Sequence, residues 1–238
     1  MLPVESHSAP NDYDSIALAY AAYTENNVWN AHYERPASLA LVGTVAGLRV
    51  LDAGCGAGAH SAALLDRGAL VTGLDKSPGL LAVARDRLGA DVPLHQADLA
   101  GPLPFVDGAF DLILASLVLH YLPDWQPTLR EFHRVLAPGG RLVISTHHPF
   151  MDHQLAGGDD YFATYAFTED WTLGGTTVTM RFWHRPLHAM TDAFAAAGFQ
   201  IEVISEPQPD PGARELFPDA FASLSAKPRF LFFAAHAR

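Results

Sequence analysis

Apolar strands and amphipathic helices alternate in the middle of this 238-residue chain, and this alternation restricts its fold more than any other feature. The pattern predicts strands over residues 48–53, 69–74, 93–97, 110–115 and 141–146, with helices over 59–66, 78–88 and 123–136. Strands that alternate with helices form a parallel sheet with right-handed crossovers, so helices cover both faces. The core is therefore predicted to be a doubly wound α/β sheet.

The flanking segments extend this core. Helices are predicted over residues 16–23, 37–45 and 186–197, and strands over 199–205 and 230–235. Residues 147–183 are rich in glycine, histidine and aromatic residues, and they are predicted to form a lid-like insertion with a hairpin turn at Gly174 and Gly175. The proline-rich residues 206–227 are predicted to be a long loop. A chain of this length can bury one core, so a single domain spanning residues 1–238 is expected.

Composition excludes several kinds of partner. The formal net charge is −11 and the basic residues are scattered, which disfavours nucleic acid. No apolar run approaches the roughly 18 residues that suggest a membrane span. Met1 to Asp14 lacks the basic and apolar blocks of a signal peptide, and the single Cys55 cannot form an internal disulfide. We therefore expect a cytoplasmic protein with a small-molecule partner, no nucleic acid and no membrane, as a monomer or homodimer.

A glycine-rich loop separates the first predicted strand of the core from its helix. Gly54, Gly56 and Gly58 lack Cβ atoms, so the backbone can approach a ligand at the carboxyl end of the sheet, where open α/β sheets bind ligands. Gly54, Gly56 and Ala59 also fit the loose G-x-G-x-x-G/A pattern of dinucleotide sites, with Asp75 about 20 residues further on. The loop alone leaves an NAD-dependent oxidoreductase open.

Further motifs follow the loop in order. Residues 50–58, V-L-D-A-G-C-G-A-G, resemble motif I of the class I S-adenosylmethionine-dependent methyltransferases. Residues 71–75, 96–99, 103–120 and the L-A-P-G-G-R run at 136–141 resemble later segments of the type 11, ubiquinone/menaquinone-biosynthesis-like group. The resemblance covers roughly residues 47–146. It implies S-adenosylmethionine as cofactor and a Rossmann-like, mostly parallel seven-stranded sheet.

This resemblance divides the chain into four parts. Residues 1–46 would be an N-terminal helical cover, 47–146 the cofactor-binding core, 147–183 the lid-like substrate insertion, and 184–238 the C-terminal part of the sheet.

The resemblance also assigns cofactor contacts. Asp75 would accept hydrogen bonds from the ribose hydroxyls, with Lys76 near the base. Asp98 would accept from the adenine amino group while Leu99 donates its backbone N–H. Asp52 would favour the ammonium group of the methionine moiety. Six further residues are predicted to contact or cover the cofactor: Tyr20, Tyr33, Gly54, Cys55, Gly56 and Ser116.

Three histidines are candidate catalytic residues. Methyl transfer is a direct displacement, and a base is needed only if the acceptor must lose a proton. His120 follows the fourth strand, and His147 and His148 follow the fifth, so all three are expected to border the methyl group.

A metal site on the histidines at 147, 148, 153, 184 and 188 is a further hypothesis. Their spacing completes no tetrahedral set, and no metal is predicted.

The predicted function is transfer of a methyl group from S-adenosylmethionine to an N, O or C atom of a small molecule. The aromatic residues of 147–183 favour an aromatic or hydrophobic acceptor. Two alternatives remain: a protein of this fold that binds the cofactor without transferring methyl or that catalyses another reaction, and the oxidoreductase.

Overall fold

The computed structural model describes residues 9–238. Residues 1–8 lie outside the described residues, and they include part of the predicted N-terminal cover and much of the segment on which the expectation of no signal peptide rests. Within residues 9–238, no helix combines the length and apolar character needed to cross a membrane.

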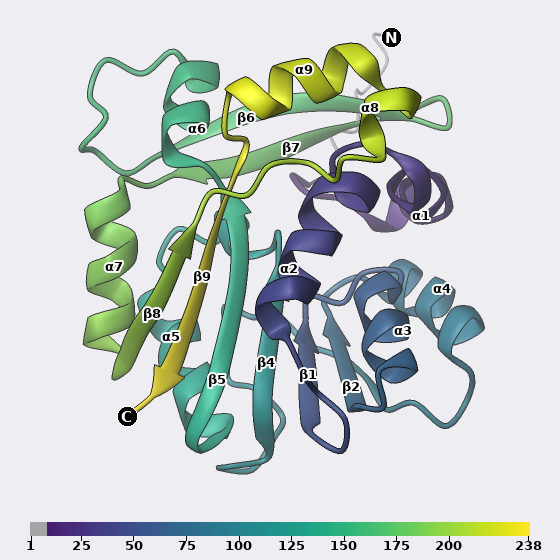
Figure 1. The fold of residues 1–238 in the computed structure, drawn as a ribbon, viewed down its shortest axis with the longest axis vertical. Helices are drawn as coiled ribbons and strands as arrows, with labels where there is room; N and C mark the ends of the chain where they lie inside the picture. Colours follow the sequence, from purple (N-terminus) through teal and green to yellow (C-terminus); the bar gives the residue numbers. More distant parts are fainter. Residues whose placement is uncertain (1–8) are drawn as a thin grey trace, which may run out of the picture.

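The centre of the fold is a seven-stranded sheet with the order β3-β2-β1-β4-β5-β9-β8 (Figure 1). Its strands are β1 (Arg49–Ala53), β2 (Leu70–Asp75), β3 (Leu94–Gln96), β4 (Phe110–Ser116), β5 (Leu136–His147), β8 (Phe199–Ser205) and β9 (Phe230–Ala237). Only β9 runs against its neighbours, pairing antiparallel with β5 and with β8. The predicted doubly wound, mostly parallel seven-stranded sheet is confirmed.

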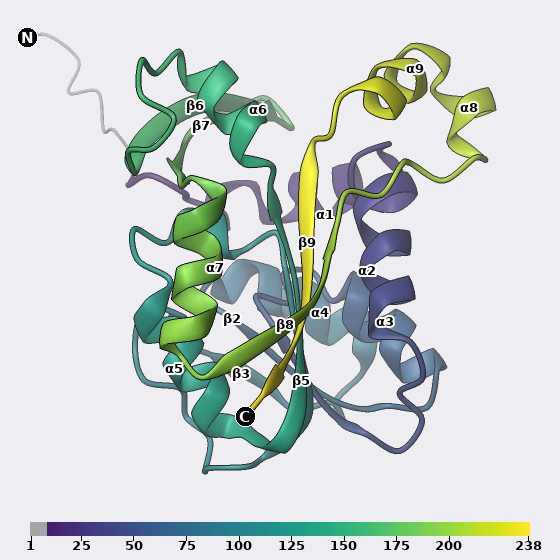
Figure 2. The same ribbon diagram turned by 60° about the vertical axis from the view of Figure 1, so that its left-hand side comes forward.

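Helices cover both faces of this sheet (Figure 2). One face carries α2 (Arg35–Val42) and α3 (Ala59–Asp66), with α4 (Pro78–Leu88) beside α3, and the other carries α5 (Gln126–Val135) and α7 (Leu187–Ala196). Leu112 and Leu114 of β4 pack with the first group, whereas Ile113 and Ala115 pack with the second. A strand buried on both faces must be apolar at every position, which is why these segments read as continuous hydrophobic runs.

Local signals set the helix ends. Ser77 caps α4 by accepting a hydrogen bond from the Leu80 N–H at 3.0 Å, Pro78 occupies the first helical position, and Gly89 follows with φ +83°.

The structure differs from the prediction at the start of the fifth strand. Leu136 already pairs with Phe110, so β5 begins there, and the Pro138–Gly140 segment is an irregularity inside β5 rather than a turn ahead of it.

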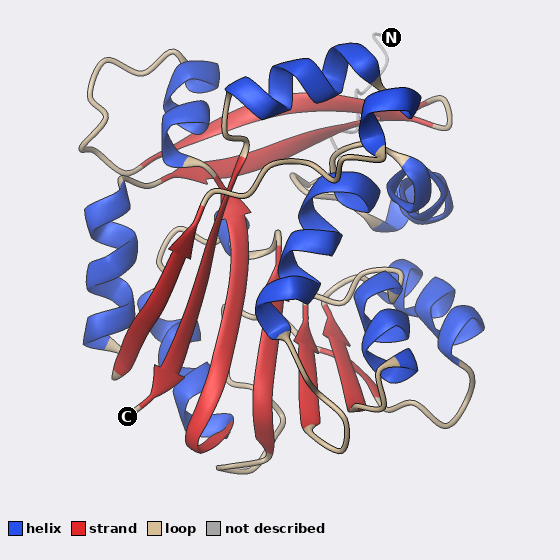
Figure 3. Cartoon of the chain, in the orientation of Figure 1, coloured by secondary structure: helices blue, strands red, loops and turns tan. Residues whose placement is uncertain are grey.

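A second layer lies over the carboxyl ends of the parallel strands (Figures 1 and 3). It contains α6 (Pro149–Ala156), the two-stranded sheet of β6 (Tyr165–Leu173) and β7 (Thr176–His184), and the helices α8 (Ala213–Leu216) and α9 (Pro218–Ala226). The hairpin at Gly174 and Gly175 is confirmed, since Leu173 pairs with Thr176. The prediction of a loop over 206–227 was wrong, because Pro218 begins a helix whose Leu224 is buried in an aromatic cluster.

The N-terminal elements complete this layer. They are the 3-10 helix η1 (Asp14–Ile16), α1 (Ala17–Asn26) and the π-helix η2 (Asn30–Glu34), which leads directly into α2. Residues 9–16, called the strap below, are fixed at both ends. Asn11 accepts a hydrogen bond from the Arg181 N–H at 2.7 Å in β7, and Asp14 accepts one from the Gly79 N–H at 2.8 Å in α4.

Candidate active site

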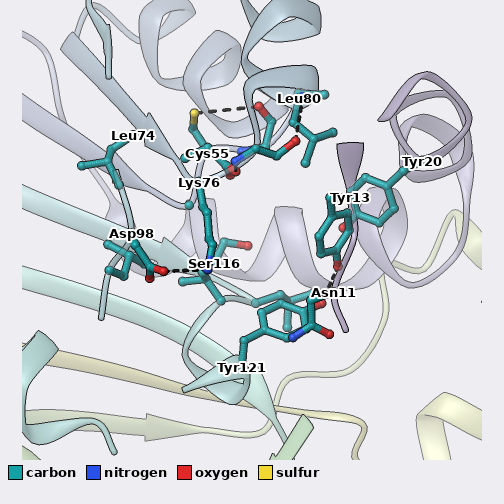
Figure 4. Close-up of a pocket in the computed structure, with 18 of the residues that line it drawn as sticks. Asn11, Tyr13, Tyr20, Cys55, Leu74, Lys76, Leu80, Asp98, Ser116 and Tyr121 are labelled. Atoms are coloured by element: carbon teal, nitrogen blue, oxygen red, sulfur yellow. Dashed lines mark hydrogen bonds and ion pairs between the residues drawn. The ribbon is translucent and has the colours of Figure 1, made fainter. Parts of the chain in front are cut away.

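A cavity of about 890 Å³ lies between the carboxyl ends of β1 to β4 and the strap (Figure 4). The loops after these four strands form its floor, and the strap, α1 and the short 3-10 helix η3 (Leu119–Tyr121) form much of the opposite wall. This volume is at the upper end of the roughly 300–1,000 Å³ typical of ligand pockets. Of the predicted cofactor residues, nine line it: Tyr20, Gly54, Cys55, Gly56, Asp75, Lys76, Asp98, Leu99 and Ser116.

The glycine loop brings backbone to the cavity surface. Gly54 and Gly56 have φ values of +82° and +54°, a region that favours glycine. A Cβ on Gly54 would lie 2.7 Å from Cγ2 of Val118, whereas a Cβ on Gly56 would meet no atom within 4 Å. The loop is therefore packed from behind at Gly54 and open toward the cavity at Gly56, as a cradle for the tail of an adenosyl cofactor requires.

Cys55 contributes bulk and backbone to this loop. The residue is 7% exposed, and its N–H donates to the Leu74 carbonyl at 2.9 Å. Burial raises the pKa of its thiol, and the neighbouring carboxylates of Asp52 and Asp75 raise it further. The thiol is therefore protonated and packed, with no nucleophilic role.

Asp75 ends β2 with its carboxylate at the cavity. One oxygen accepts the Gly56 N–H at 2.8 Å, and the other accepts the Ser77 N–H at 2.9 Å. Burial raises the pKa of this carboxyl, although these backbone donors act in the opposite direction. Each carboxylate oxygen can accept more than one hydrogen bond, so the pair of oxygens fits a ribose diol.

Asp98 and Lys76 form an ion pair at one side of the cavity (Figure 4), with 2.7 Å between Nζ and the nearer carboxylate oxygen. The other oxygen of Asp98 accepts the Ala100 N–H at 3.0 Å. Burial opposes ionisation, but Lys76 and that N–H hold the pKa of Asp98 below its usual value. Leu99 is 6% exposed, and its carbonyl accepts the Thr128 hydroxyl at 2.7 Å. This corner presents an acceptor beside an apolar wall, which suits a purine.

Three tyrosines meet on the other side of the cavity (Figure 4). The hydroxyls of Tyr13 and Tyr121 are hydrogen-bonded to each other, and the ring of Tyr20 stands edge-on to Tyr13 at 4.8 Å. Tyr20 also stacks on Trp171 of β6, with 6.4 Å between ring centroids. Burial raises the pKa of Tyr20 to about 12 and raises those of Tyr13 and Tyr121 as well. All three are therefore hydroxyl donors at neutral pH rather than bases.

Glu34 was missed by the sequence analysis as a site residue, yet it organises the floor of the cavity. Its side chain is fully buried, and Oε1 accepts hydroxyl hydrogen bonds from Ser38 at 2.5 Å, Ser116 at 2.7 Å and Ser145 at 2.6 Å. Nε2 of His60 lies 3.0 Å from Oε2. Burial opposes its charge, but His60 and the hydroxyls lower the pKa of Glu34 to about 2. Ser116, predicted to bind the cofactor, thus donates its hydroxyl to Glu34.

Two predicted cofactor residues do not line the cavity. Asp52 is 1% exposed and accepts the Ser61 hydroxyl at 2.6 Å, so its carboxylate is turned into the protein. Tyr33 is also 1% exposed, and its ring packs 5.2 Å from that of Phe230. Both positions match the expected motif in sequence, but the π-helix and the first turn of α3 bury the side chains.

The three candidate catalytic histidines lie between the sheet and the second layer and do not line the cavity. His120 stacks on His147 at 3.9 Å, and Nδ1 of His147 lies 3.1 Å from a carboxylate oxygen of Asp152. His148 caps α6 and lies 2.7 Å from Glu206. Burial lowers the pKa of His147 to about 3 and that of His120 well below its usual value. The three histidines were expected to border the methyl group, but they are packed away from the cavity.

Metal ligation has no geometric basis in residues 9–238, where no group of three or more His, Cys, Asp or Glu side chains is arranged to hold an ion. Of the histidines considered as ligands, His153 and His184 contact each other and nearby tyrosines, whereas His147 stacks on His120, His148 stacks on Phe150 and His188 contacts Phe162.

Comparison with known proteins distinguishes the cofactor classes that the glycine loop left open. Residues 51–144 match a family model described as a methyltransferase domain, type 11. Over 115 residues the chain is 41% identical to a demethylmenaquinone methyltransferase of Tropheryma whipplei, covering 48% of each protein. Over 100 residues it is 43% identical to a malonyl-[acyl-carrier protein] O-methyltransferase of Serratia marcescens, covering 42% of this chain and 38% of the relative. The chain spans about half the length, or less, of these curated relatives.

The fold extends the similarity beyond the matched segment. A crystal structure of an S-adenosylmethionine-dependent methyltransferase from Mesorhizobium loti superimposes with a TM-score of 0.68 and 29% identity, covering 84% of this chain and 96% of that one. The cofactor of this domain family is S-adenosylmethionine. Residues 51–144 thus match the type 11 methyltransferase domain, and the fold around them is similar to that of S-adenosylmethionine-dependent methyltransferases.

Proposed function

We propose that this chain transfers a methyl group from S-adenosylmethionine to a small-molecule acceptor. The observation that carries the proposal is the single cavity that runs from the Asp98 corner, past Asp75 and Gly56, to the tyrosines. One end has the polar groups for an adenosyl cofactor, and the other is aromatic, so donor and acceptor can lie in one enclosed space. Such an arrangement favours a reaction that depends on alignment and exclusion of water.

When bound, the cofactor would supply an electrophilic methyl group on a sulfonium: the acceptor forms a bond to that methyl carbon as the carbon–sulfur bond breaks, and S-adenosylhomocysteine is the leaving group. Asp75 and Asp98 would hold the nucleoside, and Gly54, Cys55 and Gly56 would border the methionine moiety. Tyr20 would shield the sulfonium with its aromatic face. These assignments are supported by the positions of the side chains on the cavity wall.

The acceptor is proposed to be a small aromatic or hydrophobic molecule that carries an oxygen. Tyr13 and Tyr121 share one hydrogen bond, so one phenol O–H of the pair is left to donate from the aromatic end, and a protonated phenol stabilises an acceptor oxygen that bears negative charge. A base role for His120, His147 or His148 gains no support from their burial, and the proton would leave through water or before binding.

The organisation into a cofactor-binding core, 47–146, and a substrate insertion, 147–183, is part of the proposal, as are a cytoplasmic location and a monomeric or dimeric state without nucleic acid. The net charge of −11 supports the exclusion of nucleic acid.

Calorimetric titration with S-adenosylmethionine, S-adenosylhomocysteine and NAD tests the cofactor directly. Binding of the first two and not of NAD is expected, and failure to bind either adenosyl compound would overturn the proposal. Transfer of labelled methyl is then measured with quinones, phenols and a malonyl thioester, because relatives are named for quinone and malonyl substrates. Cofactor binding without transfer to any acceptor would favour a binding protein or another reaction.

A further inference from the structure

His60 lies in the first turn of α3, immediately after the glycine loop, and its side chain lines the cavity while remaining only 14% exposed. Its Nε2 is turned toward the fully buried Glu34 at 3.0 Å. Within residues 9–238, Nδ1 makes no hydrogen bond, so this nitrogen is left for the cavity side.

Arg35 lines the same part of the cavity. Its Nη2 donates to the Thr24 carbonyl at 3.0 Å, and its buried Nε has no hydrogen-bond partner in the described part of the chain. Two cationic side chains thus border the cavity beside the glycine loop.

The order of the strands shows which part of the cofactor reaches this place. The sheet order β3-β2-β1 sets Asp98, Asp75 and the glycine loop in a row. If the base and ribose occupy the first two positions, the amino-acid tail extends past the glycine loop toward His60 and Arg35. We propose that His60, paired with Glu34 and assisted by Arg35, binds the carboxylate of the cofactor's methionine moiety. This inference rests on the proposed function.

The surroundings of His60 are consistent with a charged imidazole. Glu34 from η2 and Asp52 from β1 attract the proton, whereas Arg35 from α2 repels it. Burial alone would lower the pKa of His60, but the two carboxylates raise it above its usual value. Glu34 is accordingly a positioning residue: its carboxylate pairs with the ring at Nε2 as a charged neighbour and does not itself line the cavity.

Two ligands that differ only in the tail provide the test. S-adenosylhomocysteine carries the amino-acid carboxylate, whereas 5′-methylthioadenosine keeps the base and the ribose but lacks it. Calorimetry on the wild-type protein between about pH 6 and 8.5 is expected to show weaker binding of the first ligand as His60 loses its proton, with little change for the second. Parallel profiles for both ligands would overturn the inference, because titration of Asp75 affects both equally.

The His60→Gln variant is expected to bind S-adenosylhomocysteine about 10- to 100-fold more weakly, the range for a lost hydrogen bond to a charged group, with 5′-methylthioadenosine within about 2-fold of wild type. The matched control is His236→Gln, which removes a histidine paired with Glu202 at 2.7 Å outside the cavity, and it should leave both affinities unchanged. Equal losses for the two ligands, or no loss for either, would show that His60 does not bind the carboxylate.

Glu34→Gln separates positioning from binding. It should weaken S-adenosylhomocysteine binding at about pH 8 and shift the pH at which affinity is lost downward, because burial then lowers the pKa of His60 without the opposing charge of Glu34. An unchanged pH profile in a folded Glu34→Gln protein contradicts the positioning role. If that variant does not fold, the wild-type profile and His60→Gln still decide the question. If wild-type protein binds no adenosyl ligand, the proposed function fails instead.

Discussion

Individual residues of the cavity make separable contributions, and Asp75 gives the sharpest case. Replacement by Asn keeps an oxygen that can accept the Gly56 N–H but removes the charge available to the ribose. Asp75→Asn should weaken S-adenosylmethionine binding by about 10-fold or more, measured by calorimetry, with a small effect on the unfolding midpoint. Because burial raises the pKa of Asp75, wild-type affinity should also fall at acidic pH. An Asn variant with wild-type affinity would exclude the ribose contact.

The two glycines of the cradle predict different outcomes for the same substitution. Alanine at either position is strained by about 1–2 kcal/mol, since both have positive φ. Gly54→Ala adds a clash with Val118, so its loss of unfolding free energy should be about 1–3 kcal/mol larger than that of Gly56→Ala. Urea unfolding of both variants measures the difference. Equal losses of unfolding free energy would mean that the loop or the Val118 side chain shifts and relieves the contact.

Nine of the residues predicted to contact the cofactor line the cavity. Eight of them lie at or just after a strand end, whose place in a parallel sheet is fixed by topology, whereas Tyr20 lies in α1. Asp52 and Tyr33 match the same motifs but are buried, and nothing in a linear pattern shows which way a side chain turns. Glu34 was overlooked for a related reason: its partners Ser116 and Ser145 are 82 and 111 residues away. The stretch around it, N-A-H-Y-E-R-P at residues 30–36, is largely polar, so no local pattern marks Glu34 as a buried residue.

At the scale of elements, the strap is held to the second layer by the side chain of Asn11, which imitates a strand by bonding both the N–H and the carbonyl of Arg181. Asn11→Ala removes both bonds. Hydrogen exchange over residues 9–16 should accelerate, and dissociation of S-adenosylhomocysteine should become faster, while the global free energy of unfolding changes by about 1 kcal/mol. Asn11→Gly serves as the control for backbone strain, because Asn11 has φ +64°. Unchanged exchange in both variants would contradict the anchoring role.

Element boundaries were predicted well where a capping residue stands at a helix end, as at Ser77 and Gly89. They were predicted poorly where tertiary pairing decides. Leu136 joins β5 because Phe110 lies opposite, and α9 forms because Leu224 has an aromatic cluster to enter. Neither partner is near in sequence, so local propensity could not reveal these elements.

For the molecule as a whole, the buried histidines predict sensitivity to acid. Below about pH 6.5 an unfolded imidazole binds a proton, whereas folded His120, whose pKa burial lowers, stays neutral. Stability should therefore fall as pH drops below 6.5. For the neighbouring pair, the low pKa of His147, about 3, and the high pKa of Asp152, about 7, have opposite effects over this range and largely cancel.

His120→Phe isolates this contribution. As the pH falls from about 6.5 to 4.5, the free energy of unfolding of the variant should rise relative to that of wild type, by up to about 1.4 kcal/mol per pH unit. Urea unfolding at several pH values measures it. A difference that stays constant with pH would show that His120 titrates alike in the folded and unfolded states.

The chain leaves the seven-stranded sheet twice to form the second layer, once after β5 and once after β8. β5 runs without interruption into α6, and the other excursion, through α8 and α9, returns at Phe230, the pairing partner of His147. His148 joins the two, donating its N–H to the Arg229 carbonyl at 2.9 Å while its ring contacts Glu206. A chimera that grafts residues 147–183 from a relative would therefore set a foreign hairpin against a native α8–α9 cover. We expect such a graft to exchange acceptor preference only when both excursions are transplanted together. The His147–Phe230 pair is then the place where both join the native sheet.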